Sequence, residues 1–205
     1  MCWNLSSLNE EERERHVKKH IELIKYIYLT FGIKNFVLHP GDGQLVSANT
    51  TAEEINRIKK AGLESLKEII NELSTYPIVL GIENLAPKEG SWNVNDFSHL
   101  LGMHADLRVG WVLDNLHALA CGLSIETICT LIKLYKDHIV EIHLNDGAES
   151  YDPKHSALFT GKAGVSAVIY ALKQIEYKGR IIIEVDWPWE LIKSQSNLIN
   201  YFKSF

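Results

Sequence analysis

Five short apolar runs alternate with longer segments in which apolar residues recur at helical spacing. Runs so rich in Val, Ile and Leu are typical of strands that are covered on both faces, as in a parallel sheet. Strands and helices in strict alternation predict an α/β fold in which right-handed crossovers join parallel strands. The runs occupy residues 36–39, 78–83, 109–114, 139–143 and 181–184.

Capping and stop signals set the helix boundaries. Asn9 and Thr51 each precede a glutamate by three residues, a spacing that caps a helix start, and Gly32 supplies a stop. Pro188 suits the first turn of the last helix. A short sixth strand is expected near residues 157–159. The predicted helices cover residues 10–31, 52–73, 94–102, 125–135, 165–176 and 188–202.

The sheet that these elements form is predicted to curve into a barrel. No glycine-rich phosphate loop follows any run, which favours a closed barrel over an open doubly wound sheet. A (β/α) barrel needs about 250 residues, whereas this chain has 205 and starts with a helix. We therefore expect one domain over residues 1–205, a TIM-type (β/α) barrel with outer helices that is short at its N-terminus. Its open sheet edges predict a homodimer or a partner complex that covers them.

The composition of the chain argues against several classes of protein. A formal net charge of −5 argues against a broad nucleic-acid or anionic-membrane surface, so nucleic acid is not the expected partner. No apolar stretch reaches the roughly 18 residues of a membrane span. The first residues lack the basic and apolar regions of a signal peptide, which predicts a cytoplasmic location. The three cysteines show no CxxC spacing, so neither a disulfide framework nor a thiolate zinc site is indicated.

Each apolar run ends in a residue that can bind a divalent cation, and the carboxyl ends of parallel strands are where reacting groups gather. A single carboxylate there can also cap the next helix or pair with lysine. Several such charges meeting at one barrel mouth would repel one another unless a cation lay among them. A mixed oxygen and nitrogen set suits Mn, Co, Mg or Zn. The predicted metal ligands are Glu83, Asp114, His143 and Glu184.

Three further histidines are candidates for substrate binding or for a second metal. His39 ends a strand before a Pro-Gly turn that would leave the ring pointing inward, with core packing as the alternative. His117 lies three residues after Asp114, so it either turns back over the same mouth or bonds a backbone carbonyl at a helix start. His155 sits in a polar loop.

Five motifs carry these residues: His39-Pro40-Gly41, Gly81-Ile82-Glu83-Asn84, Leu113-Asp114-x-x-His117, Ile142-His143-Leu144-Asn145-Asp146 and Ile183-Glu184. In this order they resemble the motifs of the xylose-isomerase-like barrel superfamily, which includes sugar and sugar-phosphate isomerases and epimerases and endonuclease-IV-type abasic-site nucleases. The likeness runs from about residue 4 to residue 190. It implies that the four predicted ligands are shared across the superfamily. It also implies that Glu83 and Glu184 face each other across the substrate as the acid and base pair.

The resemblance implies a divalent-metal-dependent isomerase or epimerase that acts on a small sugar or sugar phosphate. A cation bound to adjacent carbonyl and hydroxyl oxygens of the sugar would lower the energy needed to remove the α-proton. A glutamate would take that proton and return it, with an enediolate as the intermediate. The nuclease branch is the alternative, although its Asp-x-His motif is one residue longer here, from Asp152 to His155. An inactive barrel with a binding or assembly role is the third hypothesis. Trp187 and Trp189 either wall the sugar pocket or pack in the core.

Overall fold

The chain divides into two compact units, Met1–Trp111 and Val112–Phe205, and the division falls inside strand β3 (Arg108–Asp114). Five strands are hydrogen-bonded in chain order, β1-β2-β3-β4-β5, with helices between them, as the alternation of patterns predicts. That the chain is a single domain stays a prediction. The computed structural model describes residues 4–41, 50–87, 90, 92–99, 108–148 and 153–204.

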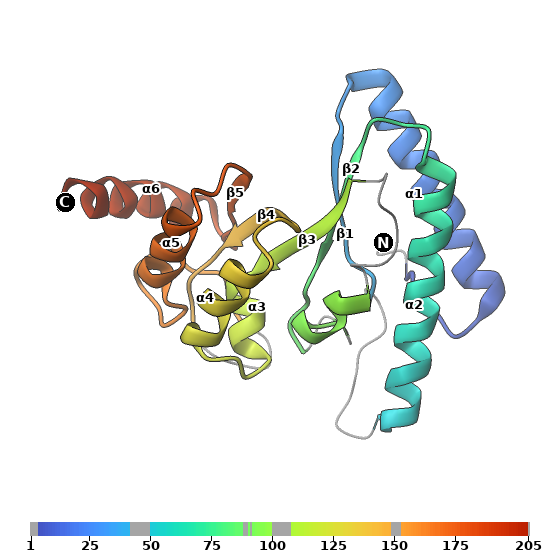
Figure 1. Cartoon of the computed structure of the whole chain (residues 1–205), viewed down its shortest axis with the longest axis horizontal. Helices are drawn as coiled ribbons and strands as arrows, with labels where there is room; N and C mark the ends of the chain where they lie inside the picture. Colours follow the sequence, from blue (N-terminus) through green and yellow to red (C-terminus); the bar gives the residue numbers. More distant parts are fainter. Residues whose placement is uncertain are drawn as a thin grey trace. The chain divides into compact units, whose positions relative to one another are not determined.

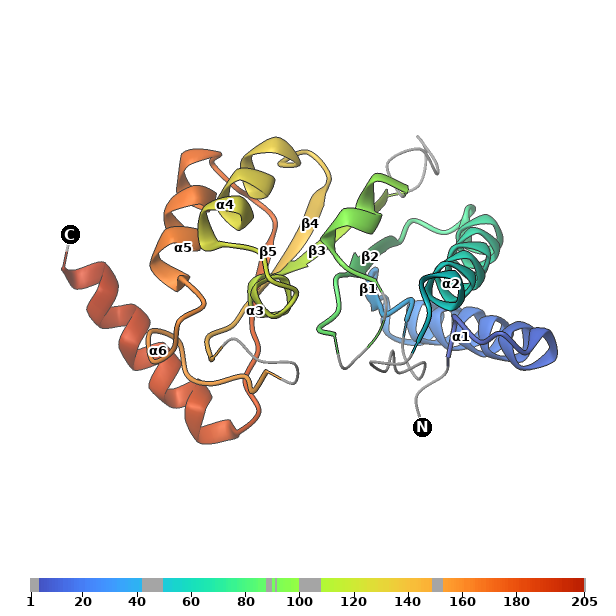
Figure 2. The same cartoon turned by 90° about the horizontal axis from the view of Figure 1, so that it is seen from below.

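The first unit pairs two parallel strands with two long helices. Strand β1 (Asn35–Leu38) lies beside β2 (Val79–Glu83) in parallel register. Helices α1 (Glu10–Phe31) and α2 (Ala52–Leu73) pack against each other on the same side of these strands (Figures 1 and 2). The predicted helix over residues 94–102 is a 3-10 helix, η1 (Val94–His99), in its described part, and its last residues lie outside the described ones.

Local signals explain how α2 begins and packs. The Thr51 side chain accepts from the backbone N–H of Glu54, whose carboxylate bonds the Thr51 backbone N–H in return, so the predicted capping box is present. Gly32 ends α1 in the left-handed conformation, with φ 69°. The buried face of α2 supplies much of the apolar core of this unit, through Ile58, Leu66, Ile69, Ile70 and Leu73.

Arg13 is the one charged side chain of α1 that is buried in the described structure. Its guanidinium bonds the carboxylates of Glu10 and Glu68 and the hydroxyl of Ser65, so the charge is compensated by partners on both helices. These contacts, with Glu10 the strongest, raise the pKa of Arg13 above its ordinary value. The charge cluster therefore ties α1 to α2 in a fixed register.

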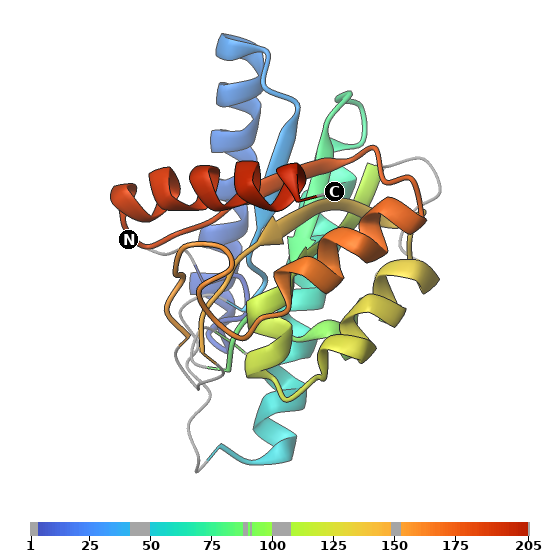
Figure 3. The same cartoon turned by 90° about the vertical axis from the view of Figure 1, so that its left-hand side faces the viewer.

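The second unit repeats the helix and strand alternation. Helices α4 and α5 lie side by side (Figure 3), and strands β4 and β5 are parallel neighbours. The elements after β3 are α3 (Asn115–Ala120), α4 (Ile125–Leu134), β4 (Ile139–Leu144), α5 (Val165–Gln174), β5 (Arg180–Ile183) and α6 (Pro188–Lys203).

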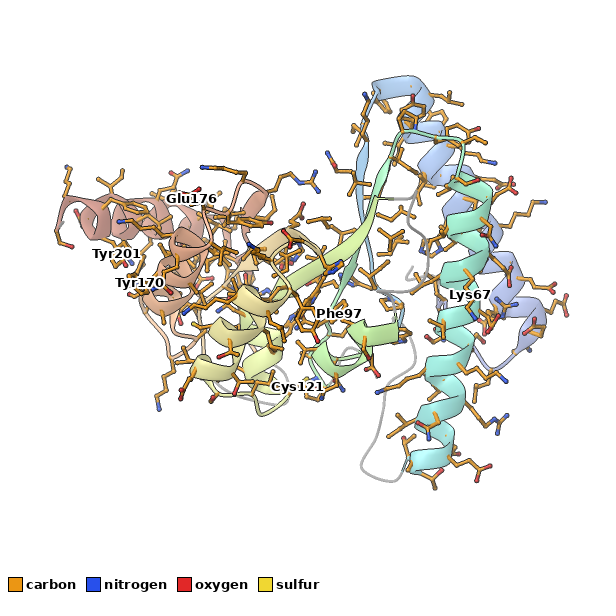
Figure 4. All side chains as sticks on the ribbon, in the orientation of Figure 1. Lys67, Phe97, Cys121, Tyr170, Glu176 and Tyr201 are labelled. Atoms are coloured by element: carbon orange, nitrogen blue, oxygen red, sulfur yellow. The ribbon has the colours of Figure 1, made fainter. Side chains whose placement is uncertain are left out.

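The expected sixth strand near residues 157–159 does not form. Phe159 adopts a left-handed conformation with φ 65°, which a strand cannot contain. The backbone N–H of Leu158 donates to the hydroxyl of Ser194 instead of to a neighbouring strand, and Phe159 stacks on Tyr201. Tyr201 is labelled on α6 in Figure 4. This segment thus anchors α6 rather than extending the sheet.

Within the described residues, none of the helices combines the length and the apolar character that crossing a bilayer requires.

We expect the substitution Thr51→Ala to lower the free energy of unfolding by about 1 kcal/mol, because the backbone N–H of Glu54 loses its acceptor. Urea-induced unfolding followed by circular dichroism measures this change. The matched control is Asn56→Ala, on an exposed position of the same helix, which should change stability by less than about 0.5 kcal/mol. Equal effects of the two substitutions would contradict a stabilising cap at Thr51.

Candidate metal centre

The predicted site residues lie at or next to the carboxyl ends of the strands. Glu83 and Asp114 are the last residues of β2 and β3. His143 lies one residue before the end of β4, and Glu184 follows β5 directly. His39 follows β1 in the same way.

Three of the predicted ligands converge within the second unit. Asp114, His143 and Glu184 each offer a ligand atom, and these atoms all lie within 4.8 Å of one another. Nδ1 of His143 lies 3.2 Å from Oε2 of Glu184. Asp114 and His143 are buried, whereas the side chain of Glu184 is 42% exposed although its Oε2, the atom nearest His143, is buried.

Asp114 also has the structural role that was its alternative. It is the N-cap of α3, and its Oδ1 accepts from the backbone N–H of His117 at 2.7 Å. Its Oδ2 accepts from the side-chain amide of Asn145, the residue two positions after His143. The carboxylate is therefore held by α3 on one oxygen and by the end of β4 on the other.

A second group forms around His117 and His155. Together with Asp114 they offer ligand atoms that lie within 4.8 Å of one another. The two Nε2 atoms are 3.2 Å apart, and the ring centroids are 5.2 Å apart. Nδ1 of His155 also lies 4.0 Å from a carboxylate oxygen of Asp186. Two ring nitrogens that face each other at this distance suit a shared proton or a cation. Asp152, the acidic residue of the predicted nuclease-like motif, lies outside the described residues.

The loop that carries His155 is organised by Asp146. Its carboxylate accepts from the backbone N–H groups of Gly147, Gly161 and Ala163 at 2.9–3.0 Å. The backbone of Asp146 also bridges Ser156, next to His155. The sequence alone gives no sign of this arrangement, because two of the three bonded N–H groups belong to residues 15 and 17 positions further along the chain.

Glu83 and His39 form a contact of their own in the first unit. Nε2 of His39 lies 2.7 Å from Oε2 of Glu83, in line with their positions at the ends of the neighbouring strands β1 and β2. His39 is thus bonded to a predicted ligand rather than packed in an apolar core. The participation of these two residues in the site that forms in the second unit stays a prediction.

The residues of the second unit fit a divalent cation. Two carboxylates and one imidazole give a mixed oxygen and nitrogen set whose charge matches that of the ion. Asn145 lies beside these residues. Its Oδ1 is buried and accepts no hydrogen bond from the described residues. A buried, unsatisfied acceptor next to a cluster of ligands is expected where an ion or its water completes the structure.

Sequence reasoning missed Glu141, a buried carboxylate two residues before His143. Its Oε1 lies 3.0 Å from Nε2 of His143, and its Oε2 accepts from Arg180. The burial of Tyr177, and secondarily the nearby charge of Glu141, raise the pKa of the Tyr177 hydroxyl to about 12. The available signal was a charged residue inside an otherwise apolar strand, which is costly unless it has partners.

Comparison with known proteins gives the family to which the chain belongs. Over residues 1–203 the sequence matches the family described as xylose isomerase-like TIM barrel. The chain belongs to this family. The match confirms the predicted fold class and the predicted superfamily, with five strands in the described residues against the eight of a closed barrel.

A curated relative of this TIM-barrel chain is a probable endonuclease 4 of Aquifex aeolicus, with 29% identity over 126 residues. That alignment covers 60% of this chain but only 42% of the relative. The chain therefore matches less than half of that protein's length.

Two solved structures share the fold. A D-tagatose 3-epimerase-like protein has a TM-score of 0.76 and 23% identity, and the match covers 98% of this chain and 73% of that one. The IolI protein, whose structure contains a bound zinc atom, has a TM-score of 0.72 and 19% identity over 91% of this chain and 66% of its own. The zinc atom is a feature of that protein, with which this chain shares the fold.

Replacing His143 by alanine should weaken Zn²⁺ binding by more than about 100-fold, because losing a ligand costs more than losing an outer partner. Competition with a chromophoric chelator measures the affinity. The control is His138→Ala, which removes an exposed imidazole and should leave the affinity unchanged. Equal Zn²⁺ affinity in the two variants would remove His143 from the ligand set.

Proposed function

We propose that this protein is a divalent-metal-dependent isomerase or epimerase that acts on a small sugar or sugar phosphate by moving a proton next to a carbonyl group. The observation that carries the proposal is the convergence of Asp114, His143 and Glu184 within the second unit. Membership of a family of xylose isomerase-like barrels supports the reaction class. The fold shared with an epimerase-like protein supports the substrate class.

Asp114, His143 and Glu184, with Glu83 from the first unit, would hold the cation, which could be Mn, Co, Mg or Zn. When bound, a divalent cation supplies electrostatic stabilisation of the negative charge that develops on the sugar oxygen. Glu184 is the half-exposed carboxylate of the set, and we assign it to proton transfer with Glu83 as the opposite acid or base. His39, His117 and His155 would then donate hydrogen bonds to sugar hydroxyl groups or bind a second cation.

Trp187 and Trp189 are suited to contact the sugar ring. They lie just past Glu184 and stack on each other with ring centroids 5.0 Å apart. Their exposed fractions, 55% and 63%, show that they are not packed in the core. Exposed indole faces bind the apolar face of a sugar ring, so we assign them to a wall of the substrate site.

Incubation of the metal-loaded protein with a panel of ketoses in deuterated water tests the proposal. We expect solvent deuterium at the carbon next to the carbonyl group, detected by proton NMR. Glu184→Gln should slow the exchange by about 10²–10⁴-fold, since it removes a general base. Glu176→Gln, at an exposed position labelled in Figure 4, is the control and should exchange at the wild-type rate. Absence of exchange with every sugar in the metal-loaded wild type would reject the proposal.

An abasic-site nuclease is the second candidate, and the Asp114, His117 and His155 group favours it. A second set of ligands beside the first would hold an additional zinc ion, as the nuclease branch requires. The similarity to a probable endonuclease 4 points the same way. Cleavage of an abasic-site oligonucleotide without sugar exchange would support this candidate. Metal binding without either reaction would support the inactive binding or assembly role.

We propose further that a homodimer covers the apolar surface of the second unit. Strand β5 stands last in the sheet order, and Ile181 and Ile182 are exposed by 46% and 42%. Along α6 the side chains of Ile192, Ile199 and Phe202 are more than half exposed. A monomer seldom leaves so many large apolar side chains together in water, so a second copy of this surface is the assigned partner.

Ile192→Asp should shift the protein from dimer to monomer, because an unpaired carboxylate would be buried in the interface. Size-exclusion chromatography with light scattering reports the mass against the 23.3 kDa of one chain. Asn71→Asp is the matched control, since it places the same charge at an exposed polar position of α2. A wild-type protein that is monomeric at micromolar concentration would contradict the dimer.

A further inference from the structure

His155 lies in a loop, yet the backbone around it is bonded to regular elements on two sides. The carbonyl oxygen of His155 accepts from the backbone N–H of Asp186, 3.0 Å away, in the link between β5 and α6. The backbone N–H of Ser156 donates to the carbonyl oxygen of Asp146 at 2.8 Å, just past the end of β4. The position of His155 is therefore set by bonds on both of its sides.

A third anchor comes from α6, which binds both polar groups of the Leu158 backbone. The Leu158 N–H donates to the Ser194 hydroxyl at 3.0 Å, and its carbonyl oxygen accepts from the side-chain amide of Asn197 at 2.7 Å. Ser194 is fully buried, and its hydroxyl donates to the carbonyl oxygen of Glu190 at 2.7 Å. Because its single proton is used within the helix, the hydroxyl can only accept from Leu158.

The side chains of α6 that contact this loop lie on one face of the helix. Ser194, Asn197 and Tyr201 follow one another at spacings of three and four residues, which places them in a row along α6. Tyr201, labelled in Figure 4, stacks on Phe159 with ring centroids 4.9 Å apart. This row, which we call the α6 clamp, thus contacts two consecutive loop residues, Leu158 and Phe159.

The clamp bears on the second group of candidate ligands. His117 belongs to α3, which is fixed to the end of β3 by its cap, whereas His155 belongs to the clamped loop. The two rings therefore face each other from separate supports. A binding site needs its side chains held to within about 0.5 Å. Only two residues lie between His155 and Leu158, so loss of the Leu158 anchors is expected to separate the rings.

We propose that Ser194 and Asn197 are positioning residues for His155. Through the backbone of Leu158 they keep its ring against that of His117, so that the two rings can share a cation. The inference rests on the proposed metal-dependent function and deepens it by giving α6 a part in the site. Bonds that only stabilised the fold would lower the stability of the protein when removed, but would leave the two rings together.

The contact between the rings is measured without any metal. In metal-free protein, nuclear Overhauser effects should connect the ring protons of His117 and His155, because their Nε2 atoms are 3.2 Å apart. The signals of His155 are assigned by comparison with His155→Ala. Ser194→Ala and Asn197→Ala each remove one anchor of the loop and should weaken or abolish these effects.

Matched controls are available on the same helix. Ser196→Ala and Asn200→Ala make the same chemical changes at exposed positions of α6 and should keep the ring contact. Ser196 makes the same kind of bond along the helix, since its hydroxyl donates to the carbonyl oxygen of Ile192 at 3.1 Å. A ring contact that persists in Asn197→Ala would overturn the inference. That variant decides the test even where Ser194→Ala does not fold, because its side chain is only partly buried.

Zn²⁺ binding tests whether the clamp acts through His155. Competition with a chromophoric chelator should find two Zn²⁺ ions per wild-type chain, one of which depends on His155. Asn197→Ala should weaken that ion by about tenfold, the effect of losing a partner that orients a ligand, and leave the other within about twofold. Adding Asn197→Ala to His155→Ala should cost nothing more, because residues that act as a unit are not additive.

Two results of this measurement would overturn the inference. One is an equal loss of affinity from Asn197→Ala with and without His155, since the effect would then not pass through that ring. The other is a wild-type protein that binds one Zn²⁺ ion and keeps it in His155→Ala.

The outcomes also separate this inference from the proposed function. Two Zn²⁺ ions, one of them dependent on Asn197, without deuterium exchange into any sugar, would support the clamp while rejecting the isomerase. Deuterium exchange in the wild type, together with a ring contact that is unchanged in Asn197→Ala, would support the isomerase while rejecting the clamp.

Discussion

Buried charge must be balanced, and this requirement governs the second unit of the protein. Parallel strands bring their carboxyl ends to one edge, where Asp114 and Glu184 meet His143. The buried acid Asp114 has its own donors, since it accepts from Asn145 and from the start of α3. The remaining negative charge would destabilise this edge of the sheet by itself and suits a divalent cation, which is the basis of the proposed metal-dependent function.

Much of the fold and part of the site could be predicted because their signals are local. Apolar runs and capping residues such as Asn9 and Thr51 act over a few residues, so strands and helices lie close to their predicted bounds. The positions of Asp114, His143 and Glu184 at strand ends follow from the same runs. Parallel pairing then brings them together, since neighbouring strands end at the same edge.

The rest depends on contacts between residues far apart in sequence. The segment over residues 157–159 is expected to be a strand, but the backbone N–H of Leu158 bonds Ser194 of α6 and the segment does not join the sheet. The short helix α3 is not among the predicted helices, although helix capping is the alternative role given for Asp114. His155 lies beside His117 in a loop in which the Asp146 carboxylate accepts from three backbone N–H groups. Glu141 stands out in the sequence as a charge in an apolar run, yet its partner is set by strand register.

The pairing of Glu141 with Arg180 also constrains how the gene can change. Glu141 is buried and Arg180 about a third exposed, so losing Arg180 alone would leave a buried carboxylate without its charge partner, whereas replacing both by apolar residues of similar volume is often neutral. Codons 141 and 180 are therefore expected to drift together, through joint replacement or not at all. A descendant that lost both would keep its sheet, but Nε2 of His143 would no longer face a carboxylate at 3.0 Å, so the orientation of that ring would depend on fewer contacts.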